Sequence, residues 1–545
     1  MVPAPKSLGA GTLAQTLLVT ARAHAADVAL RADDGSLELT YEEALERIRA
    51  IAAGLRALGV RRGDAVGLMM ANRAEFHLVD SAAMLLGAVP FSVYNTLPPE
   101  QVGYVMGDAG NRVAVCDAAH LATVLAARDH GARVERVVGV DGGGDLSLAQ
   151  LAALGDPAEL DLDAVAAQVR PDDVLTLIYT SGTTGPPKGV ELTHHGMLEE
   201  LRGMHAAIPI HEGGRAVSFL PSAHVADRLN SHYAAFMAYG SAVTSVADLR
   251  RVFDVVARVR PTVHGNVPRL WEKLAASLRA RGVTTRSDGA EVRAELGFEQ
   301  CEWLSTGAAP IAVDVLEFLD ALGMRLCEVW GMSEASCVAI TNRPGAWRPG
   351  SVGLPLHNAE IALADDGELL VRGPLVMRGY RNRPRLTAEA VDDDGWLRTG
   401  DVARVDDDGF FWLIDRKKEL IINSAGKNMS PANIEAALKS AGPLIGQACV
   451  VGDGRPYNVA LLVLDPEAAA GLDPADPAVL ARVRAEVDAA NARLARVEQV
   501  RRFALLAGEW RPGGDELTPT MKLRRRPIAE KYAATIAALY AQPQG

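Results

Sequence analysis

An eleven-residue stretch in the first half of the sequence has the composition of a loop that binds phosphate groups. Its residues are Tyr179, Thr180, Ser181, Gly182, Thr183, Thr184, Gly185, Pro186, Pro187, Lys188 and Gly189. Glycines let backbone N–H groups turn toward an anion, hydroxyl groups donate further hydrogen bonds, and the lysine adds positive charge. An apolar run at 174–178 predicts a buried strand that leads into the loop. The spacing does not fit the Walker A pattern, so the stretch predicts a polyphosphate site of another kind.

Six segments further along the chain carry single groups that could act beside a bound phosphate. They lie at 219–228, 264–273, 305–310, 330–334, 396–401 and 517–525. Taken one at a time, each has an ordinary structural interpretation. His224 reads as a core histidine, Glu334 as a solvated surface charge and Lys522 as one more cation in a basic tail. A generic loop of glycine and serine reads as a flexible turn, but the full eleven-residue string at 179–189 favours phosphate binding. The occurrence of the whole series in one chain favours a catalytic role for these residues over the structural interpretations.

In this order, the loop and the segments resemble the motifs of the adenylate-forming, or AMP-binding, superfamily. That superfamily includes acyl-CoA synthetases, firefly luciferases and nonribosomal adenylation domains. The resemblance spans residues 179–522, and the segments at 264–273 and 518–522 are similar to those of long-chain fatty acid–CoA ligases. Trp330 and Ser333 depart from the family's Tyr-Gly-x-Thr-Glu motif, and Asp227 stands where a glutamate is common.

The resemblance implies a role for each matching residue. Those that would bind ATP and AMP are Thr180, Ser181, Gly182, Thr183, Thr184, Gly185, Lys188, Gly307, Ala308, Ala309, Trp330, Gly331, Met332, Ser333, Asp401 and Arg416. Asp401 and Arg416 would contact the ribose, since a carboxylate offers a vicinal diol its acceptors in a fork. Those that would take part in catalysis are Lys522, His224, Thr184 and Glu334. Glu334 and Thr180 would hold Mg²⁺, which prefers hard oxygen ligands.

A basic segment at 415–419 resembles the hinge of the family, with Lys418 at the pivot position. The residues that would bind coenzyme A are Ser424, Ala425, Gly426 and Lys427. Many family members have two glycines where this chain has Ala425 and Gly426, and the extra methyl group narrows the approach to coenzyme A. The resemblance thus implies ATP, Mg²⁺, coenzyme A and a fatty acid as the small molecules that this chain uses.

The implied reaction has two steps. A fatty acid carboxylate attacks the α-phosphate of ATP and releases pyrophosphate, and the coenzyme A thiol then takes the acyl group from the adenylate. Between the steps the C-terminal domain would rotate, withdrawing Lys522 and bringing in the loop at 424–427. The alternatives are an acyl-AMP ligase that loads a carrier protein, a CoA ligase for a medium-chain or other carboxylate, and a catalytically silent protein. A luciferase-like oxygenase ranks far below these.

The elements that must position these residues alternate between strand and helix. Thr40 and Glu43 form a capping-box pattern that opens a helix closed by Gly59. Residues 65–70 and 89–94 predict strands, and 75–86 predict a helix between them. This alternation predicts an α/β architecture of layered sheets.

The pattern changes near residue 400, where a smaller α+β unit is expected. It would hold strands at 420–422, 447–451 and 460–464 and helices from Pro431 and across 479–494. We therefore expect a large N-terminal domain at 1–414 for the AMP and acyl sites, a hinge at 415–418, and a mobile C-terminal domain at 419–545 that carries the catalytic lysine.

Length and composition fit a cytoplasmic enzyme with more than one domain. The chain has 545 residues, whereas a single core stops growing near ~250–300 residues. A net charge of −12 argues against a nucleic-acid binder, because phosphate backbones attract basic surfaces. Five scattered cysteines without a CxxC pair favour a reducing cytosol over a disulfide framework or a zinc site. No transmembrane segment or secretory signal is expected; peripheral membrane contact and the oligomeric state are left open.

Overall fold

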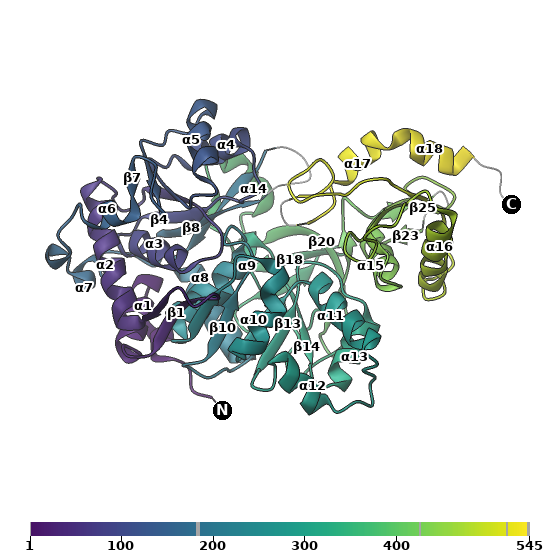
Figure 1. The fold of residues 1–545 in the computed structure, drawn as a ribbon, viewed down its shortest axis with the longest axis horizontal. Coiled ribbons are helices and arrows are strands. Elements are labelled where there is room, and N and C mark those ends of the chain that lie inside the picture. The colour runs from purple at the N-terminus through teal and green to yellow at the C-terminus, as the bar shows by residue number, and fades with distance from the viewer. Residues whose placement is uncertain (1, 181–185, 424–426, 519–520, 542–545) are drawn as a thin grey trace.

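The computed structural model describes residues 2–180, 186–423, 427–518 and 521–541. It folds them into a larger N-terminal body and a smaller C-terminal body, which begins after Arg416 and lies at one end of the long axis in Figure 1. The described strands form seven sheets. Five of these sheets belong to the N-terminal body and two to the C-terminal body.

The first sheet is parallel, with the strand order β4-β3-β5-β6-β7. Its strands are β3 (Ala65–Met69), β4 (Val89–Ser92), β5 (Val113–Cys116), β6 (Arg136–Gly139) and β7 (Leu146–Ser147). The helices around it include α2 (Tyr41–Ala57), α3 (Ala74–Leu85), α4 (Pro99–Ala109), α5 (Leu121–Ala127) and α6 (Leu148–Ala152). Every residue of β3, β4 and β5 is buried, as in parallel sheets covered on both faces.

Two mixed sheets form the next layers, with the orders β10-β11-β1-β2 and β12-β13-β14-β15-β16. Their strands are β1 (Val28–Ala32), β2 (Glu38–Thr40), β10 (Arg215–Ser218), β11 (Ala242–Ser245), β12 (Val263–Asn266), β13 (Trp303–Thr306), β14 (Leu326–Trp330), β15 (Ile340–Thr341) and β16 (Leu354–Pro355). The main helices here are α1 (Leu13–Ala23), α8 (His194–Ala207), the π-helix η4 (Arg228–Ala238), α10 (Val252–Val259), α11 (Pro268–Ala280), α12 (Gly289–Leu296) and α13 (Val313–Ala321).

Two antiparallel sheets complete the N-terminal body, with the orders β19-β9-β8 and β17-β18-β20-β21. Their strands are β8 (Val174–Thr180), β9 (Lys188–Thr193), β17 (Glu360–Leu363), β18 (Glu368–Arg372), β19 (Gly379–Tyr380), β20 (Leu397–Val405) and β21 (Phe411–Arg416). The first of these sheets brackets the glycine-rich stretch, and the second ends at the passage into the C-terminal body.

The C-terminal body has its own sheet, β24-β25-β26, and a short hairpin of β22 and β23. Its elements are β22 (Ile421–Ile422), β23 (Asn428–Met429), α15 (Pro431–Ser440), β24 (Ile445–Val451), β25 (Asn458–Leu464), α16 (Pro477–Asn491), β26 (Val500–Leu505), α17 (Arg525–Lys531) and α18 (Ala533–Ala541). Two hydrophobic cores lie within it, and neither includes a residue of the N-terminal body. The C-terminal body is therefore packed independently of the larger one.

Ion pairs join the two bodies. Arg269 and Lys273, one turn apart on α11, contact the segment that follows β25: Arg269 Nη2 lies 2.6 Å from Asp465 Oδ2, and Lys273 Nζ lies 2.6 Å from Glu467 Oε2. Asp465 is nearly buried, and Glu467 is exposed. These contacts are charged rather than apolar, as is usual for an interface that can open.

The sequence predicted several of these elements closely. The capping box at Thr40 and Glu43 is present, and α2 follows it. The predicted strands and helix between residues 65 and 94 correspond to β3, α3 and β4, and the predicted C-terminal elements correspond to β22, α15, β24, β25 and α16. Strand β26, helices α17 and α18 and the π-helix were not predicted. The exact domain limits at 414 and 418 stay a prediction.

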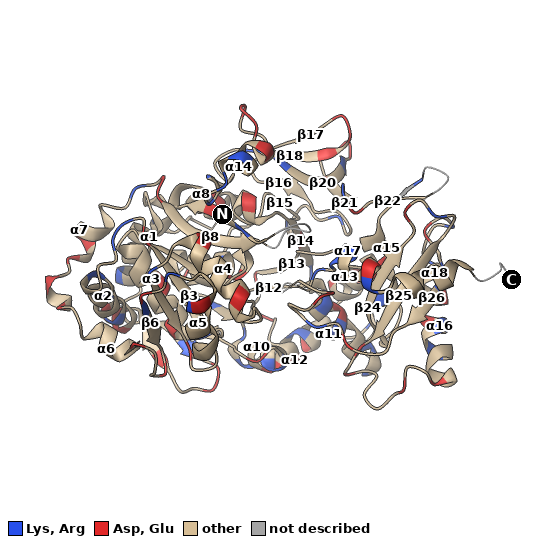
Figure 2. Cartoon of the chain, turned by 90° about the horizontal axis from the view of Figure 1, so that it is seen from above, with Lys and Arg blue, Asp and Glu red and all other residues tan. Residues whose placement is uncertain are grey.

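The length of the apolar helices and the distribution of charge indicate which surfaces the protein can contact. Among the residues that the structure describes, no helix is long and apolar enough to span a bilayer. Figure 2 shows acidic and basic residues interspersed along the elements of both bodies.

Candidate functional site

Asp401 is the residue around which several predicted nucleotide-binding groups meet. It lies opposite Arg416 in the β20–β21 pairing, and Trp330 ends β14, a strand of another sheet. The Trp330 indole Nε1–H donates to Asp401 Oδ2 at 2.9 Å. Arg416 Nε lies 3.1 Å from Oδ1 but is not aligned for a hydrogen bond, so Oδ1 is a buried acceptor that lacks a hydrogen-bond donor among the described residues. Such an orphaned acceptor suits a ligand hydroxyl group.

Glu334 lies beside a tyrosine that the motif analysis did not single out. The Tyr380 hydroxyl donates to Glu334 Oε1 at 2.9 Å, and Lys188 Nζ lies 4.1 Å from the centroid of the Tyr380 ring. Burial and the Glu334 carboxylate raise the pKa of Tyr380, so its hydroxyl stays a donor. Tyr380 thus connects the lysine of the glycine-rich stretch to the predicted metal ligand. A lone tyrosine outside every motif gave no signal in the sequence.

The base of the glycine-rich stretch is formed by β8 and β9. Thr180 and Lys188 are direct partners in this antiparallel pair, so the loop leaves and re-enters the sheet at one place. The predicted residues Ser181, Gly182, Thr183, Thr184 and Gly185 lie outside the described residues. Their part in binding phosphate stays a prediction.

Close packing of the chain leaves no room for a side chain at two of the predicted glycines. A Cβ at Gly331 would lie 1.7 Å from the carbonyl oxygen of Cys337, and one at Gly307 would lie 2.7 Å from Val329 Cγ2. Ala308 follows Gly307 with φ = 70°, in the left-handed region that alanine seldom adopts. The turns at 307–309 and 331–337 are therefore tightly constrained beside the end of β14. Ala309, Met332 and Ser333 lie in these same turns.

His224 caps the short helix α9 (Val225–Asp227), which leads into η4. Its Nδ1 accepts a hydrogen bond from the Ala226 backbone N–H at 3.1 Å, so a neutral ring carries its proton on Nε2. Burial, and secondarily the charge of Lys522, lowers the His224 pKa to about 4. At neutral pH His224 therefore offers a neutral N–H donor.

Lys522 comes from the C-terminal body yet interacts with groups of the N-terminal body. Lys522 is exposed, and charged groups of the N-terminal body lie near enough to act on its ammonium group. Partial desolvation and the Arg416 guanidinium lower its pKa, and Asp401, Glu334 and Glu419 act in the opposite direction. The structure thus places Lys522 within electrostatic reach of His224, Glu334, Asp401 and Arg416; their roles in catalysis stay a prediction.

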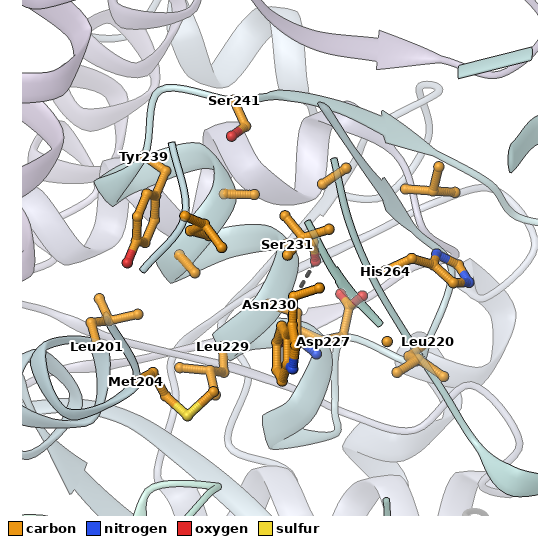
Figure 3. A pocket seen from close by; sticks show the side chains of 18 of the residues that line it. Leu201, Met204, Leu220, Asp227, Leu229, Asn230, Ser231, Tyr239, Ser241 and His264 are labelled. Atoms are coloured by element: carbon orange, nitrogen blue, oxygen red, sulfur yellow. Dashed lines mark hydrogen bonds between the residues drawn. The ribbon is translucent and has the colours of Figure 1, made fainter. Parts of the chain in front are cut away.

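An apolar pocket is walled by α8, β10, η4 and β12, and residues on both sides of the turn that carries His224, Leu220 and Asp227, line it. The free volume in it is about 860 Å³ including the part open to solvent. Figure 3 shows Leu201 and Met204 at one side and His264 at the other, with Asp227 and Asn230 between them. Burial raises the pKa of Asp227 to about 7 against the opposing hydrogen bonds of Ser231 and Ser218, so near neutral pH this carboxyl group is protonated in a large share of the molecules. The sequence noted Asp227 only as a departure from its family and gave no sign of its place in the pocket.

The remaining predicted residues lie at the start of the C-terminal body. Lys418 is exposed in the turn after β21, and Lys427 is exposed in the β22–β23 hairpin. Asp415 joins the two ends of this region, because its Oδ2 accepts from the Ser430 hydroxyl at 2.6 Å, next to the start of α15. Ser424, Ala425 and Gly426 lie outside the described residues, so their binding of coenzyme A stays a prediction.

The comparisons with known proteins agree with this arrangement. The AMP-binding enzyme family matches residues 17–381, and the AMP-binding enzyme C-terminal domain matches residues 418–544. The chain belongs to the AMP-binding enzyme family. It is 46% identical to a protein described as putative fatty-acid–CoA ligase fadD11 of Mycobacterium tuberculosis, over 73% of this chain and 79% of that protein. It is 35% identical to the long-chain-fatty-acid–CoA ligase FadD15 of Mycobacterium bovis, over 92% of each.

Solved structures share the fold at lower identity. The adenylation domain of the carboxylate reductase from Mycobacterium chelonae superposes with a TM-score of 0.83 at 23% identity, covering 99% of this chain and 94% of that one. The Mycobacterium tuberculosis fatty acyl CoA synthetase gives a TM-score of 0.69 at 23% identity, covering 96% and 99%. These likenesses establish the α/β adenylate-forming fold, with a large N-terminal domain and a C-terminal domain.

The contact between Gly331 and Cys337 predicts a steric effect on nucleotide binding. Gly331→Ala forces residues 331 and 337 apart, and overpacking of this kind costs about 1–3 kcal/mol. We expect KM for MgATP to rise about tenfold, which lies within that range. Gly345→Ala is the matched control, because a Cβ there meets nothing within 4 Å. Equal KM values for the two variants would contradict the constraint.

The lowered pKa of Lys522 predicts an alkaline limb in the pH profile. If the charged ammonium is the active form, kcat/KM for ATP falls as pH rises through a pKa below the ordinary 10.5. This ratio reports the free enzyme, before ATP adds its negative charge. Lys522→Arg keeps the charge at high pH, and its profile, at a lower overall rate, should lose this limb. An unchanged limb in the variant would assign the titration to another group.

Proposed function

We propose that the chain is an AMP-forming fatty acid–CoA ligase. ATP and a fatty acid give the acyl-adenylate and pyrophosphate, and coenzyme A then converts the adenylate to acyl-CoA and AMP. The observation that carries the proposal is the meeting of Lys522 with His224, Glu334 and Asp401 beside an apolar pocket. The two named relatives, one described as a putative fatty-acid–CoA ligase and one as a long-chain-fatty-acid–CoA ligase, are similar to this chain over most of its length and support the same activity.

The nucleotide would lie between the two bodies. Asp401 Oδ1 would accept a hydrogen bond from a ribose hydroxyl, and Arg416 would hold the other side of the same sugar. Lys188 and the glycine-rich loop would face the phosphates. Lys522 would stabilise the negative charge that develops when the carboxylate oxygen bonds to the α-phosphorus and pyrophosphate leaves.

The acyl chain would enter the apolar pocket with its carboxylate toward His224. Burial of methylene groups supplies the binding energy, about 0.8 kcal/mol for each CH₂ removed from water. The neutral Nε2–H of His224 would donate to a carboxylate oxygen and orient the other oxygen for attack. Because this histidine stays uncharged at neutral pH, it would not hold the carboxylate in a rigid ion pair.

The donor set fits Mg²⁺ bound together with substrate. Among the described residues no group of three or more His, Cys, Asp or Glu side chains could hold a metal. Mg²⁺ is commonly bound by one or two carboxylates plus substrate phosphates, and Glu334 with the Thr180 hydroxyl would provide the protein's share. When bound, the ion would neutralise phosphate charge. Tyr380 would fix the Glu334 carboxylate through their hydrogen bond.

Thioester formation would need a second arrangement of the two bodies. We propose a domain at 1–414, a hinge at 415–418 with Lys418 as pivot, and a mobile domain at 419–545. Rotation would withdraw Lys522 and bring Ser424, Ala425, Gly426 and Lys427 toward the adenylate. The five cysteines are all unpaired, which supports a reducing compartment and hence the cytoplasm as the place of the reaction.

The proposal is tested by product release across a series of saturated fatty acids of increasing length. We expect the purified protein with MgATP to release AMP only when coenzyme A is present, with a maximum at one chain-length class. Adenylate formation without thioester would point instead to a carrier protein as acceptor. No turnover with any fatty acid would contradict the proposal.

The charged contacts between the bodies predict an effect on adenylation. Lys273→Glu places like charges against Glu467 and disfavours the observed arrangement. Partly exposed pairs are worth about 0.2–1 kcal/mol, so the rate of pyrophosphate release should fall about twofold to fivefold. Adding Glu467→Lys should restore it.

The control for this charge reversal is Arg281→Glu. Arg281 pairs with Glu295 at 2.6 Å within the N-terminal body, so its reversal should leave the rate unchanged. A double variant as slow as Lys273→Glu alone would show that this pair does not hold the bodies together.

A further inference from the structure

The most enclosed charged cluster of the N-terminal body lies behind the turn that carries His224. Its central residue is Arg228, which has no exposed surface. Arg228 Nη1 lies 2.7 Å from Asp80 Oδ2 on α3, and His232 Nε2 lies 2.9 Å from Asp80 Oδ1. Asp80 and His232 are likewise fully buried. None of these groups has a part in the proposed chemistry.

Arg228 reaches the His224 turn directly. Its Nε donates to the Ser222 carbonyl oxygen at 3.1 Å, two residues before His224. Its Nη2 donates to Ser92 Oγ at 3.1 Å, at the end of β4, and the Ser222 hydroxyl donates to the same Ser92 oxygen at 3.2 Å. The turn is thus fixed to the first sheet both through the guanidinium group and through the direct hydrogen bond between Ser222 and Ser92.

The same residue also begins a wall of the acyl pocket. Arg228 is the first residue of the π-helix η4, and Leu229, Asn230 and Ser231, which follow it, line the pocket. A π-helix of this length is rare, and π-type backbone is frequent at functional sites. Arg228 therefore joins the turn that would orient the carboxylate to the wall that would contact the chain.

A buried ion pair is weak evidence for stability, because desolvation offsets much of the attraction. Apolar side chains could fill this space at similar stability, whereas they could not hold a backbone carbonyl at a fixed position. The Nδ1 of His77 lies 3.0 Å from the Nδ1 of His232. Burial lowers the pKa of both histidines, so neither adds charge to the cluster at neutral pH. Asp80 is the counter-ion of Arg228, and these two charges remain paired.

We propose that Arg228 is a positioning residue for adenylation. By holding the Ser222 carbonyl group, it sets the distance between the His224 Nε2–H and the pocket wall to the distance that a bound acyl carboxylate requires. The inference rests on the proposed function. Replacing Arg228 should therefore lower the rate of adenylation and leave the affinity for the nucleotide unchanged, because Arg228 has no hydrogen bond to β14 or β20, the described strands that carry Trp330 and Asp401. Misplacement of a reacting group by about 1 Å can cost about 10²-fold in rate.

The test is the pyrophosphate burst with MgATP and saturating fatty acid in the absence of coenzyme A. Its amplitude counts the folded, active chains, and its rate reports adenylation. For Arg228→Lys, which loses the fork of donors, we expect an amplitude near one per chain, a rate at least about tenfold lower, and an unchanged KM for MgATP. Tyr233→Phe is the matched control, because its hydroxyl accepts from Arg228 Nη1 at 3.0 Å without contacting the turn. This variant should keep the wild-type rate.

A full-amplitude burst of Arg228→Lys at the wild-type rate would overturn the inference, as would an equal loss in Tyr233→Phe. If Arg228→Lys does not fold, Ser92→Ala is compared with Ser222→Ala: both remove the Ser222–Ser92 hydrogen bond, and only Ser92→Ala also removes the acceptor of Arg228 Nη2. A slower burst in Ser92→Ala than in Ser222→Ala, with unchanged KM for MgATP, would support the inference, and equal bursts would overturn it. A wild type without any burst would overturn the proposed function and this inference with it.

Discussion

In the proposed reaction, Lys522 acts at the nucleotide site while the C-terminal body lies against the N-terminal one. The two bodies have separate hydrophobic cores, and charged pairs between α11 and the segment after β25 join them. The position of one ammonium group therefore depends on a contact that is polar and modest in strength. An interface of this kind can place a catalytic group for one step and release it for the next.

On the N-terminal side the site is rigid. Asp401 is held by the Trp330 indole and paired in register with Arg416, and the turns after β13 and β14 pack so closely that Gly307 and Gly331 have no room for a side chain. Glu334 is fixed through Tyr380, and His224 is fixed at a helix N-terminus with a defined tautomer. Preorganised donors and charges of this kind contribute to catalysis because they need no rearrangement when charge develops. The proposed enzyme thus combines a fixed site for the nucleotide and the acyl group with one cation, Lys522, that moves with the C-terminal body.

The sequence was sufficient for the parts that depend on local patterns. The capping box at Thr40 and the buried strands of the first sheet could be predicted from residue types and spacing, whereas Asp401, Glu334 and Lys522 were singled out by the resemblance of their motifs to those of the family. Tyr380, the ionisable wall residue Asp227 and the buried pair of Arg228 and Asp80 could not be predicted in either way. Their importance depends on contacts between residues far apart in sequence, such as the 148 positions that separate Asp80 from Arg228. No local pattern encodes which side chain will meet another across a folded core.

The measurement that tests this account most directly separates the two chemical steps. Lys522→Ala and the wild type would each be given MgATP with fatty acid, and separately a presynthesised acyl-adenylate with coenzyme A. The account predicts that the variant loses adenylate formation and converts the supplied adenylate to thioester at close to the wild-type rate. Equal impairment of both steps would show that Lys522 supports the fold or the coenzyme A step, and would contradict the role assigned to the contact between the two bodies.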